Sequence, residues 1–244
     1  MHANSRPVIS TQVSVNEHLP HRLARHLLSP FRKPIASYNR IAVEAAHAAW
    51  QQAGSVPLIL DSGCGIGLST LNLARSFPSS FVIGVDQSED RLSRQPDWQG
   101  ELPGNCIRVR ADLIDFWRLL HEAGVSLSRH YLFYPNPWPK KQHLGRRWHG
   151  HPVFPFMVAL GGEFECRSNW RIYIEECAAA LAQLTGAPVP TEAYSPGADE
   201  EYRVGGVSSL EAPRYMTPFE KKYALSGHAL WRCRVALPPS EFSA

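Results

Sequence analysis

The stretch of residues 57–86 constrains the fold of this chain more than any other part of the sequence. An apolar run there ends in Asp61, and the glycine turn Gly-Cys-Gly-Ile-Gly at residues 63–67 follows it almost at once. Residues 68–76 then have helical periodicity, and a second apolar run ends in Asp86. A strand, a glycine turn, a helix and a second strand in this order form a βαβ unit, whose two strands pair in parallel.

The same alternation of strands and helices continues along the chain. Residues 186–213 are rich in Pro, Gly, Ser and Ala and are predicted to form a long loop. Together these elements predict an α/β fold with a doubly wound, mostly parallel sheet, which binds ligands beyond the carboxyl ends of its strands. Besides the βαβ unit, the sequence predicts helices over residues 37–52, 113–123, 153–160 and 170–184, and strands over residues 106–110, 129–134, 163–167 and 230–237.

The glycine turn is the first candidate for ligand binding. Gly63, Gly65 and Gly67 carry no side chain, so a ligand can approach the main chain closely at these positions. Such a turn is a weak signal alone, because proteins that bind no nucleotide also use it. The longer Gly-x-Gly-x-x-Gly spacing typical of NAD-binding proteins is absent.

Three aspartates lie at the ends of successive predicted strands, and these ends meet at one edge of a parallel sheet. Asp86 can accept hydrogen bonds from both hydroxyls of a ribose, and Asp112 can accept one from an adenine amino group. Asp61 adds a carboxylate near the position for a sulfonium and an α-amino group. This set favours S-adenosylmethionine as the cofactor. The alternative is that each aspartate only caps the following helix.

The length and composition are those of one globular domain. The chain has 244 residues, of which 44% are hydrophobic and 19% charged, and we expect a domain over residues 37–244. Residues 1–36 are polar, basic and proline-containing, and we expect them to be a flexible arm. No apolar run is long enough for a membrane span, and residues 1–20 lack the long apolar stretch of a secretory signal. We therefore expect a cytoplasmic protein without membrane contact, either a monomer or a homodimer.

Cysteine and histidine spacing predicts no metal site. The five cysteines are odd in number, and no two of them have Cys-x-x-Cys spacing. They are predicted to be reduced thiols that form neither a disulfide framework nor a zinc site. Among the eleven histidines, His149 and His151 bracket a glycine, a pair that we interpret as polar loop residues and not as ligands.

Positive charge is concentrated in one segment. The net charge of +3 does not by itself indicate a nucleic-acid partner. Residues 131–162, however, contain four Lys or Arg residues, three histidines and no acidic residue. This distribution favours contact with phosphates, although a short basic run is more often a solvated loop.

Two motifs resemble those of a known family. Residues 134–147 read Tyr-Pro-Asn-Pro-Trp-Pro-Lys-Lys-Gln-His-Leu-Gly-Arg-Arg. They resemble the signature of the tRNA (guanine-N7)-methyltransferases, whose usual form is Phe-Pro-Asp-Pro-Trp-Pro-Lys-Lys-x-His followed by paired arginines. Residues 217–222, Thr-Pro-Phe-Glu-Lys-Lys, are similar to the family's Thr-x-Tyr/Phe-Glu element, which a glycine follows, here Gly227. The similarity runs from about residue 58 to residue 237.

The resemblance implies a Rossmann-like class I methyltransferase that methylates N7 of a guanosine in tRNA, in the variable loop, with S-adenosylmethionine. It also implies the residues of the site by their positions in the motifs. Asn136 occupies the implied catalytic position. The implied cofactor contacts are Asp61, Gly63, Asp86, Asp112 and Asn136; the implied substrate contacts are Lys140, Asn169, Thr217 and Glu220; and the implied contacts to tRNA phosphates are Lys141, Arg146 and Arg147.

The chain departs from the family pattern at two positions, because Asn136 and Asn169 stand where the family has aspartates. Asparagine keeps the hydrogen-bonding shape of aspartate and loses its charge. Guanine N7 carries a lone pair and no proton, so its methylation needs no general base. The guanine becomes cationic, however, and loss of two carboxylates is expected to cost about 10- to 1000-fold in rate.

Two other functions remain open from the sequence. Asn136-Pro137-Trp138 is similar to the Asn-Pro-Pro-Tyr/Phe motif of methyltransferases that act on amino groups, although its second proline is missing. The two asparagines are also compatible with a catalytically weak paralogue that binds RNA or S-adenosylmethionine. Methyl transfer to tRNA, followed by nucleoside analysis, separates these three possibilities.

Overall fold

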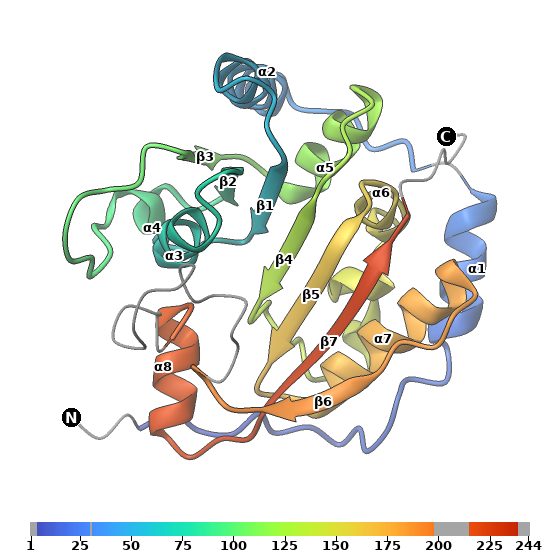
Figure 1. Cartoon of the computed structure of the whole chain (residues 1–244). Coiled ribbons are helices and arrows are strands. Elements are labelled where there is room, and N and C mark those ends of the chain that lie inside the picture. The colour runs from blue at the N-terminus through green and yellow to red at the C-terminus, as the bar shows by residue number, and fades with distance from the viewer. Residues whose placement is uncertain (1–3, 30, 198–214, 239–244) are drawn as a thin grey trace.

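The computed structural model describes residues 4–29, 31–197 and 215–238, and within them the chain forms a seven-stranded sheet (Figure 1). The strand order is β3-β2-β1-β4-β5-β7-β6. Strands β1 to β5 pair in parallel, whereas β7 runs antiparallel to both β5 and β6. The strands are β1 (Leu58–Ser62), β2 (Phe81–Asp86), β3 (Cys106–Arg110), β4 (Arg129–Phe133), β5 (Gly162–Ser168), β6 (Thr191–Tyr194) and β7 (Leu230–Leu237).

Helices cover both faces of this sheet. Leu58 and Leu60 of β1 belong to a large buried cluster with residues of α1, α2, α5, α6 and α7. Ile59 belongs to a second cluster with Leu73 and Ala74 of α3, because successive side chains of a strand point to opposite faces. The helices are α1 (Leu19–Leu28), α2 (Ser37–Gln52), α3 (Leu68–Ser76), α4 (Glu89–Ser93), α5 (Leu113–Glu122), α6 (Phe154–Ala159), α7 (Arg171–Thr185) and α8 (Pro218–Leu225). The predicted doubly wound, mostly parallel α/β fold is confirmed.

Close packing of α3 on the sheet explains one glycine within a strand. A Cβ atom added to Gly84 of β2 would lie 2.1 Å from the hydroxyl oxygen of Thr70 on α3. Thr70 is itself fully buried and donates a hydrogen bond to Asp61 at the end of β1. Glycine at position 84 therefore lets α3 approach the sheet, which fixes the glycine turn that leads into this helix.

The predicted loop over residues 186–213 contains an edge strand. Residues 191–194 form β6, whose Thr191 and Tyr194 pair with Cys233 and Leu230 of β7. Turn-forming residues dominate the composition of this stretch, so the sequence did not predict a strand that is only four residues long. The rest of the predicted loop, from residue 198 onward, lies outside the described residues.

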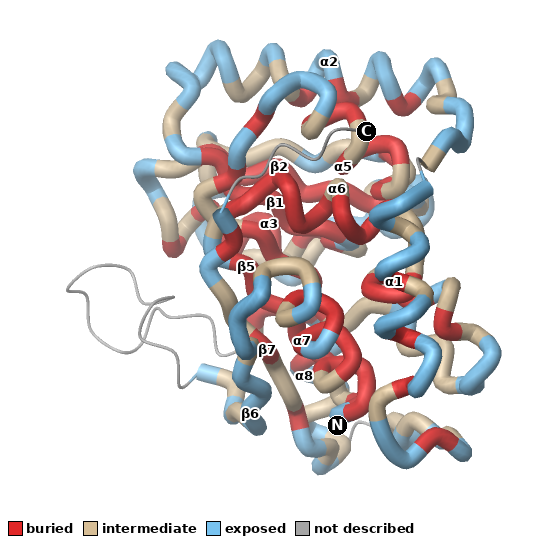
Figure 2. The backbone as a smooth tube through the Cα atoms, turned by 90° about the vertical axis from the view of Figure 1, so that its right-hand side faces the viewer, coloured by how far each residue is buried: buried red, intermediate tan, exposed pale blue. Residues whose placement is uncertain are grey.

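The expectation of a flexible arm over residues 1–36 is wrong for its described part. Residues 19–28 form α1, which packs against α7, and Leu19 and Leu23 are completely buried (Figure 2). These leucines are four residues apart and therefore share one face of the helix. Their burial is enough to order a segment whose composition is polar, and the folded unit extends well before residue 37. Among the described residues, no helix is both long and apolar enough to cross a membrane.

Candidate active site

A cleft of about 680 Å³ lies at the carboxyl edge of the parallel strands. Its walls come from the glycine turn, the ends of β2 and β4, the start of α5, the loop after β4 and the start of α8. In Figure 1 the arrowheads of β1, β4 and β5 point to the side of the sheet on which α8 lies. The cleft therefore stands where doubly wound sheets bind their ligands, and its size is that of a small-molecule site.

The glycine turn exposes its main chain to the cleft. Gly63 and Gly65 have φ angles of 78° and 60°, which only glycine adopts without cost, and a Cβ atom at either position would meet no other atom within 4 Å. The amides of Gly63 and Cys64 both donate hydrogen bonds to the carbonyl of Val85 and so hold the turn against β2. Both glycines line the cleft.

Gly67 has a different environment from the other two glycines. It has a φ of 85° and precedes the first residue of α3, and a Cβ atom there would lie 2.2 Å from Cδ of Arg108. It does not line the cleft. Its absent side chain accommodates Arg108, which donates a hydrogen bond to the carbonyl of Ile66.

Asp86 is the buried acid of the cleft. Its two carboxylate oxygens accept hydrogen bonds from the amides of Gly65, at 3.0 Å, and Ser88, at 2.8 Å. The guanidinium of Arg91 on α4 lies 3.5 Å from the same carboxylate and also lines the cleft. These contacts hold the charge of Asp86 at the end of β2.

Asp61 lies behind the glycine turn and is almost completely buried. Its Oδ2 accepts hydrogen bonds from the hydroxyls of Ser69, at 2.6 Å, and Thr70, at 2.7 Å. Burial raises the pKa of Asp61 to about 6, against the opposing effect of these two hydroxyls. Its Oδ1 is buried and accepts no hydrogen bond from the described residues, and Asp61 does not line the cleft.

Asp112 caps a helix and also lines the cleft. Its Oδ1 accepts a hydrogen bond from the amide of Ile114 and caps α5. Its Oδ2 accepts one from Lys33 at 3.2 Å, and the residue is half-buried on the wall of the cleft. Capping α5 therefore does not remove Asp112 from the site.

We call residues 134–147 the signature loop. Tyr134 and Trp138 have φ angles of 51° and 43°, a left-handed conformation that costs bulky residues about 1–3 kcal/mol. Between them lies Asn136, an exposed residue whose Oδ1 accepts a hydrogen bond from the amide of Trp138 at 3.3 Å. All three residues line the cleft. Such backbone outliers gather at functional sites, where the surrounding structure sustains them.

Trp138 is held on two sides by other residues of the loop. The guanidinium of Arg146 lies 4.8 Å from the centre of its ring, and His143 contacts it edge-on at 5.7 Å between ring centres. Arg146, which the sequence predicts to contact phosphates, is exposed and lines the cleft, so it lies where the cleft meets the surface. Packing within the loop thus orients the indole while leaving it on the cleft wall.

Two other predicted contacts, Lys140 and Lys141, are exposed but lie outside the cleft walls. The ammonium of Lys141 lies 2.7 Å from the carboxylate of Glu17, which precedes α1. A single exposed ion pair of this kind is weak and is easily exchanged for another partner. Both lysines therefore remain available at the surface.

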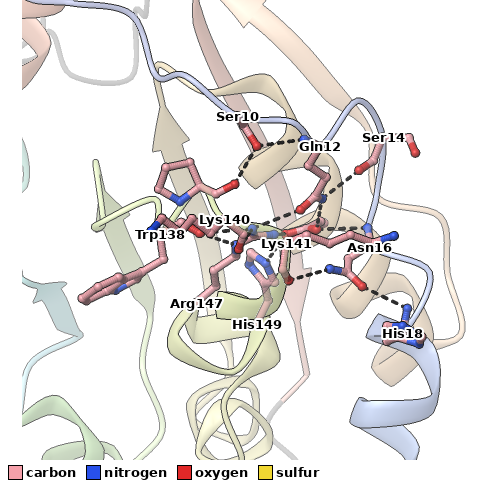
Figure 3. A network of polar contacts seen from close by, with 12 residues as sticks. Ser10, Gln12, Ser14, Asn16, His18, Trp138, Lys140, Lys141, Arg147 and His149 are labelled. Carbon is pink, nitrogen blue, oxygen red and sulfur yellow. Dashed lines mark hydrogen bonds and ion pairs between the residues drawn. The ribbon is translucent and has the colours of Figure 1, made fainter.

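The prediction that Arg147 contacts phosphates is wrong. Arg147 is completely buried, and its guanidinium pairs with the buried carboxylate of Glu176 on α7 (Figure 3). It also donates hydrogen bonds to the carbonyls of Trp138 and Lys140. The basic segment contains no acid of its own, but the fold supplies one from 29 residues further along the chain.

The other predicted substrate residues differ in their positions. Thr217 lines the cleft and caps α8, since its hydroxyl oxygen accepts a hydrogen bond from the amide of Glu220. Glu220 is buried, and its carboxylate forms an ion pair of 2.7 Å with Arg167 of β5. Asn169 is outside the cleft walls, where its amide nitrogen lies 3.1 Å from Nδ1 of His228. Of these three residues, only Thr217 lines the cleft.

Several residues of the site escape prediction from the sequence. Arg91 and Arg94 line the cleft, although no motif marks them. Phe219 also lines it, and it lies within the Thr-x-Tyr/Phe-Glu element without an assigned role. The sequence gives one indication for Arg91: it follows Asp86, the acid at the end of a predicted strand, by little more than one helical turn, so the two side chains can meet. The polar contacts that Gln12 makes to Arg147 and Glu176 have no signal in local spacing.

Comparison with known proteins agrees with this geometry. A family profile described as "Putative methyltransferase" matches residues 55–233. The tRNA (guanine-N(7)-)-methyltransferase of Saccharophagus degradans is 30% identical over 184 residues, which are 72% of this chain and 74% of that protein. The enzyme of the same name from Acidovorax sp. (strain JS42) is 26% identical over 181 residues, 72% of this chain and 66% of that protein, so the chain spans about two thirds of its length.

A solved structure shares the fold. The crystal structure of the 16S rRNA methyltransferase KamB matches with a TM-score of 0.50 at 17% identity, over 85% of this chain and 96% of that one. The family profile covers well over half of the chain, and the motifs of residues 134–147 and 217–222 lie within or beside the aligned region. The chain therefore belongs to the tRNA (guanine-N7)-methyltransferase family of S-adenosylmethionine-dependent enzymes.

Proposed function

We propose that this chain transfers a methyl group from S-adenosylmethionine to N7 of a guanosine in the variable loop of tRNA. The observation that carries the proposal is the continuity of the cleft. The same cleft is lined by the glycine turn with Asp86 and Asp112 and by the signature loop with Asn136 and Trp138. A cofactor half and an acceptor half thus share one cavity, as direct transfer between two bound molecules requires.

The residues of the first half fit S-adenosylmethionine. The open main chain at Gly63 and Gly65 admits close approach of the cofactor, and the buried carboxylate of Asp86 can accept hydrogen bonds from the ribose hydroxyls. When bound, the cofactor supplies an electrophilic methyl group on a sulfonium.

The residues of the second half orient the acceptor. Guanine N7 attacks with its lone pair, so the protein has no proton to remove, and orientation is worth up to roughly 7–11 kcal/mol of the barrier. Asn136 and Thr217 place polar groups on the cleft wall, and Trp138 presents an aromatic surface there. We assign Asn136 to holding the base and the cofactor in register, a role that needs its hydrogen-bonding shape.

The tRNA body is bound by exposed cations around the entrance. Lys140, Lys141 and Arg146 are exposed on the signature loop, while Arg147 is buried and takes no part. Contacts to phosphates position the substrate and make its binding sensitive to salt. The reaction would take place where tRNA is modified, in the cytoplasm.

Two matched tRNA transcripts test the proposal. One carries a guanosine in its variable loop, and the other differs only by an adenosine at that position. With labelled S-adenosylmethionine, we expect the first transcript to take up one methyl group and the second to take up none. Equal labelling of both would exclude the variable loop, and labelling of neither would remove the support for tRNA as the substrate.

A further inference from the structure

The main-chain carbonyl groups of residues 138–141, four consecutive residues of the signature loop, all accept hydrogen bonds from side chains. The guanidinium of Arg147 donates hydrogen bonds to the carbonyls of Trp138, at 3.1 Å, and Lys140, at 3.2 Å. The intervening carbonyl, that of Pro139, accepts a 2.6 Å hydrogen bond from the hydroxyl of Ser10. The next one, that of Lys141, accepts a 3.1 Å hydrogen bond from the side-chain amide of Asn16. Two of these four contacts therefore come from the N-terminal segment.

The same segment holds Arg147 itself in place (Figure 3). The side chain of Gln12 accepts a hydrogen bond from Arg147 at 3.0 Å and donates one to Glu176 at 2.6 Å. The main-chain amide of Asn16 donates a second hydrogen bond to the same carboxylate oxygen. Gln12 thus bridges the two members of a buried ion pair, and nearly all of this network is shielded from water.

The beginning of the segment contacts the residues that follow α8. The amide of Ser5 donates to the hydroxyl of Ser226, just after α8, and the carbonyl of Ser5 lies 3.0 Å from Nε2 of His228. Asn169 donates to Nδ1 of His228, which leaves the proton of the neutral ring on Nε2, where it points to Ser5. Residues 5–16 therefore run from the end of α8 to the signature loop (Figure 1).

We propose that residues 5–16 form a strap that sets the geometry of the acceptor half of the cleft. Ser10, Gln12 and Asn16 are positioning residues, which act on the acceptor through the main chain of the signature loop. The strap fixes the carbonyls of Pro139 and Lys141 directly, and it fixes the other two carbonyls through Arg147. This keeps Trp138 in its left-handed conformation and Asn136 on the cleft wall. The effect on catalysis rests on the proposed methyl transfer, whereas the effect on the loop does not.

Hydrogen exchange of the full chain tests the strap without any substrate. The double variant Ser10→Ala/Gln12→Met removes the contacts to Pro139, Arg147 and Glu176 while keeping the side-chain volume of residue 12. Amide protons of residues 138–147 are expected to exchange at least about tenfold faster in this variant, since each lost hydrogen bond is worth about that factor. Amides of β1 and β4 are expected to be unchanged, which shows that the variant is folded.

Kinetics on tRNA then separate positioning from binding. We expect kcat of the double variant to fall about 10- to 100-fold, with KM for tRNA and Kd for S-adenosylmethionine within about twofold of the unaltered protein. The single variant Ser10→Thr keeps the hydroxyl at position 10. We expect its hydrogen exchange and its kcat to equal those of the unaltered chain. Val13→Ala, at an exposed strap position without a contact to the loop, is the matched control and is expected to change neither quantity.

The outcomes decide the proposal independently of the substrate. Unchanged exchange in the double variant would overturn it, and so would a loss of kcat that Val13→Ala shares. If the unaltered protein methylates no tRNA, the proposed function fails, while faster exchange confined to residues 138–147 still supports the strap.

Discussion

The guanidinium of Arg147 and the carboxylate of Glu176 form an ion pair in which neither side chain is exposed to water. Arg147 belongs to the signature loop, and Glu176 lies in the middle of α7 beneath it. His149 and Gln12 contribute hydrogen bonds to the same carboxylate. Each buried charge is the counter-ion of the other, so the pair anchors the signature loop to α7.

Removing one member of this pair is expected to destabilise the protein strongly. Glu176→Gln leaves the charge of Arg147 buried without a counter-ion, and we expect the free energy of unfolding to fall by about 3–5 kcal/mol. Urea denaturation measures this change. The neighbouring Glu175→Gln breaks only the exposed pair with Arg171 and is expected to cost less than about 1 kcal/mol. Equal losses in the two variants would refute the buried-pair account.

His130 is expected to contribute to the pH dependence of stability, with a sign opposite to that of Asp61, whose raised pKa favours the folded state as the pH falls. Burial lowers the pKa of His130 to about 3, and its Nε2 lies 2.8 Å from the hydroxyl of Ser62. Between about pH 3 and 6.5 the unfolded chain holds a proton on this ring that the folded chain does not, so stability falls as the pH falls. The expected slope from this one group is about 1.4 kcal/mol per pH unit.

Urea denaturation at pH 6.5 and 4.5 checks this prediction. His130→Gln is expected to show a shallower slope than the unaltered protein, by about the contribution of one group. His149 and His151 also have pKa values lowered by burial, so part of the slope is expected to persist in the variant. An unaltered slope in His130→Gln would show that the ring is protonated in the folded protein.

Asp86 is expected to carry much of the affinity for S-adenosylmethionine. Asp86→Asn keeps an acceptor for the turn amide and removes the charge, and we expect Kd to rise about 10- to 100-fold, as for hydrogen bonds to charged groups. Titration calorimetry measures this affinity. The exposed Asp97→Asn, outside the cleft, is the control. If both variants bind the cofactor like the unaltered protein, Asp86 does not contact it.

Exposed cations of the signature loop are expected to set the salt dependence of tRNA binding. Lys140→Ala and Arg146→Ala should each weaken binding and lower the slope of log K against log salt by about 1, one phosphate contact per residue. Filter binding over a range of salt concentrations measures the slope. A slope that neither substitution alters would place the phosphates elsewhere on the surface.

Asn136 is expected to tune the rate without controlling the binding of tRNA. Asn136→Asp preserves the acceptor for the Trp138 amide and adds a negative charge near the guanine as it becomes cationic. We expect kcat to rise about tenfold in Asn136→Asp and to fall at least about tenfold in Asn136→Ala. Single-turnover kinetics at saturating cofactor measure both. A gain of more than about 1000-fold in Asn136→Asp would instead identify the unaltered chain as a weak paralogue.

Local sequence patterns predicted well where the glycine turn and Asp86 lie in the fold. The glycine turn and Asp86 lie within one βαβ unit, where residue spacing and geometry are tightly coupled. Their place at the carboxyl edge follows from the parallel pairing of β1 and β2. For this reason the sheet and the positions of Gly63, Gly65 and Asp86 on the cleft wall could be read from the sequence.

Contacts between distant segments could not be predicted in this way. Arg147 and Arg146 are adjacent arginines that local sequence does not distinguish. Arg147 is buried because it pairs with Glu176, whereas Arg146 is exposed. Ser10 and Gln12 likewise belong to a polar segment whose order depends on burial of Leu23 elsewhere in it. Long-range pairing of this kind leaves no periodic trace, so composition alone suggested a flexible arm.

The measurement that tests the central claim most directly is nucleoside analysis of unmodified bulk tRNA after incubation with the protein and labelled S-adenosylmethionine. The account predicts that the label appears in 7-methylguanosine and that Asn136→Ala reduces it at least about tenfold. Label in a methylated adenosine, or no label in tRNA although the cofactor binds, would contradict it.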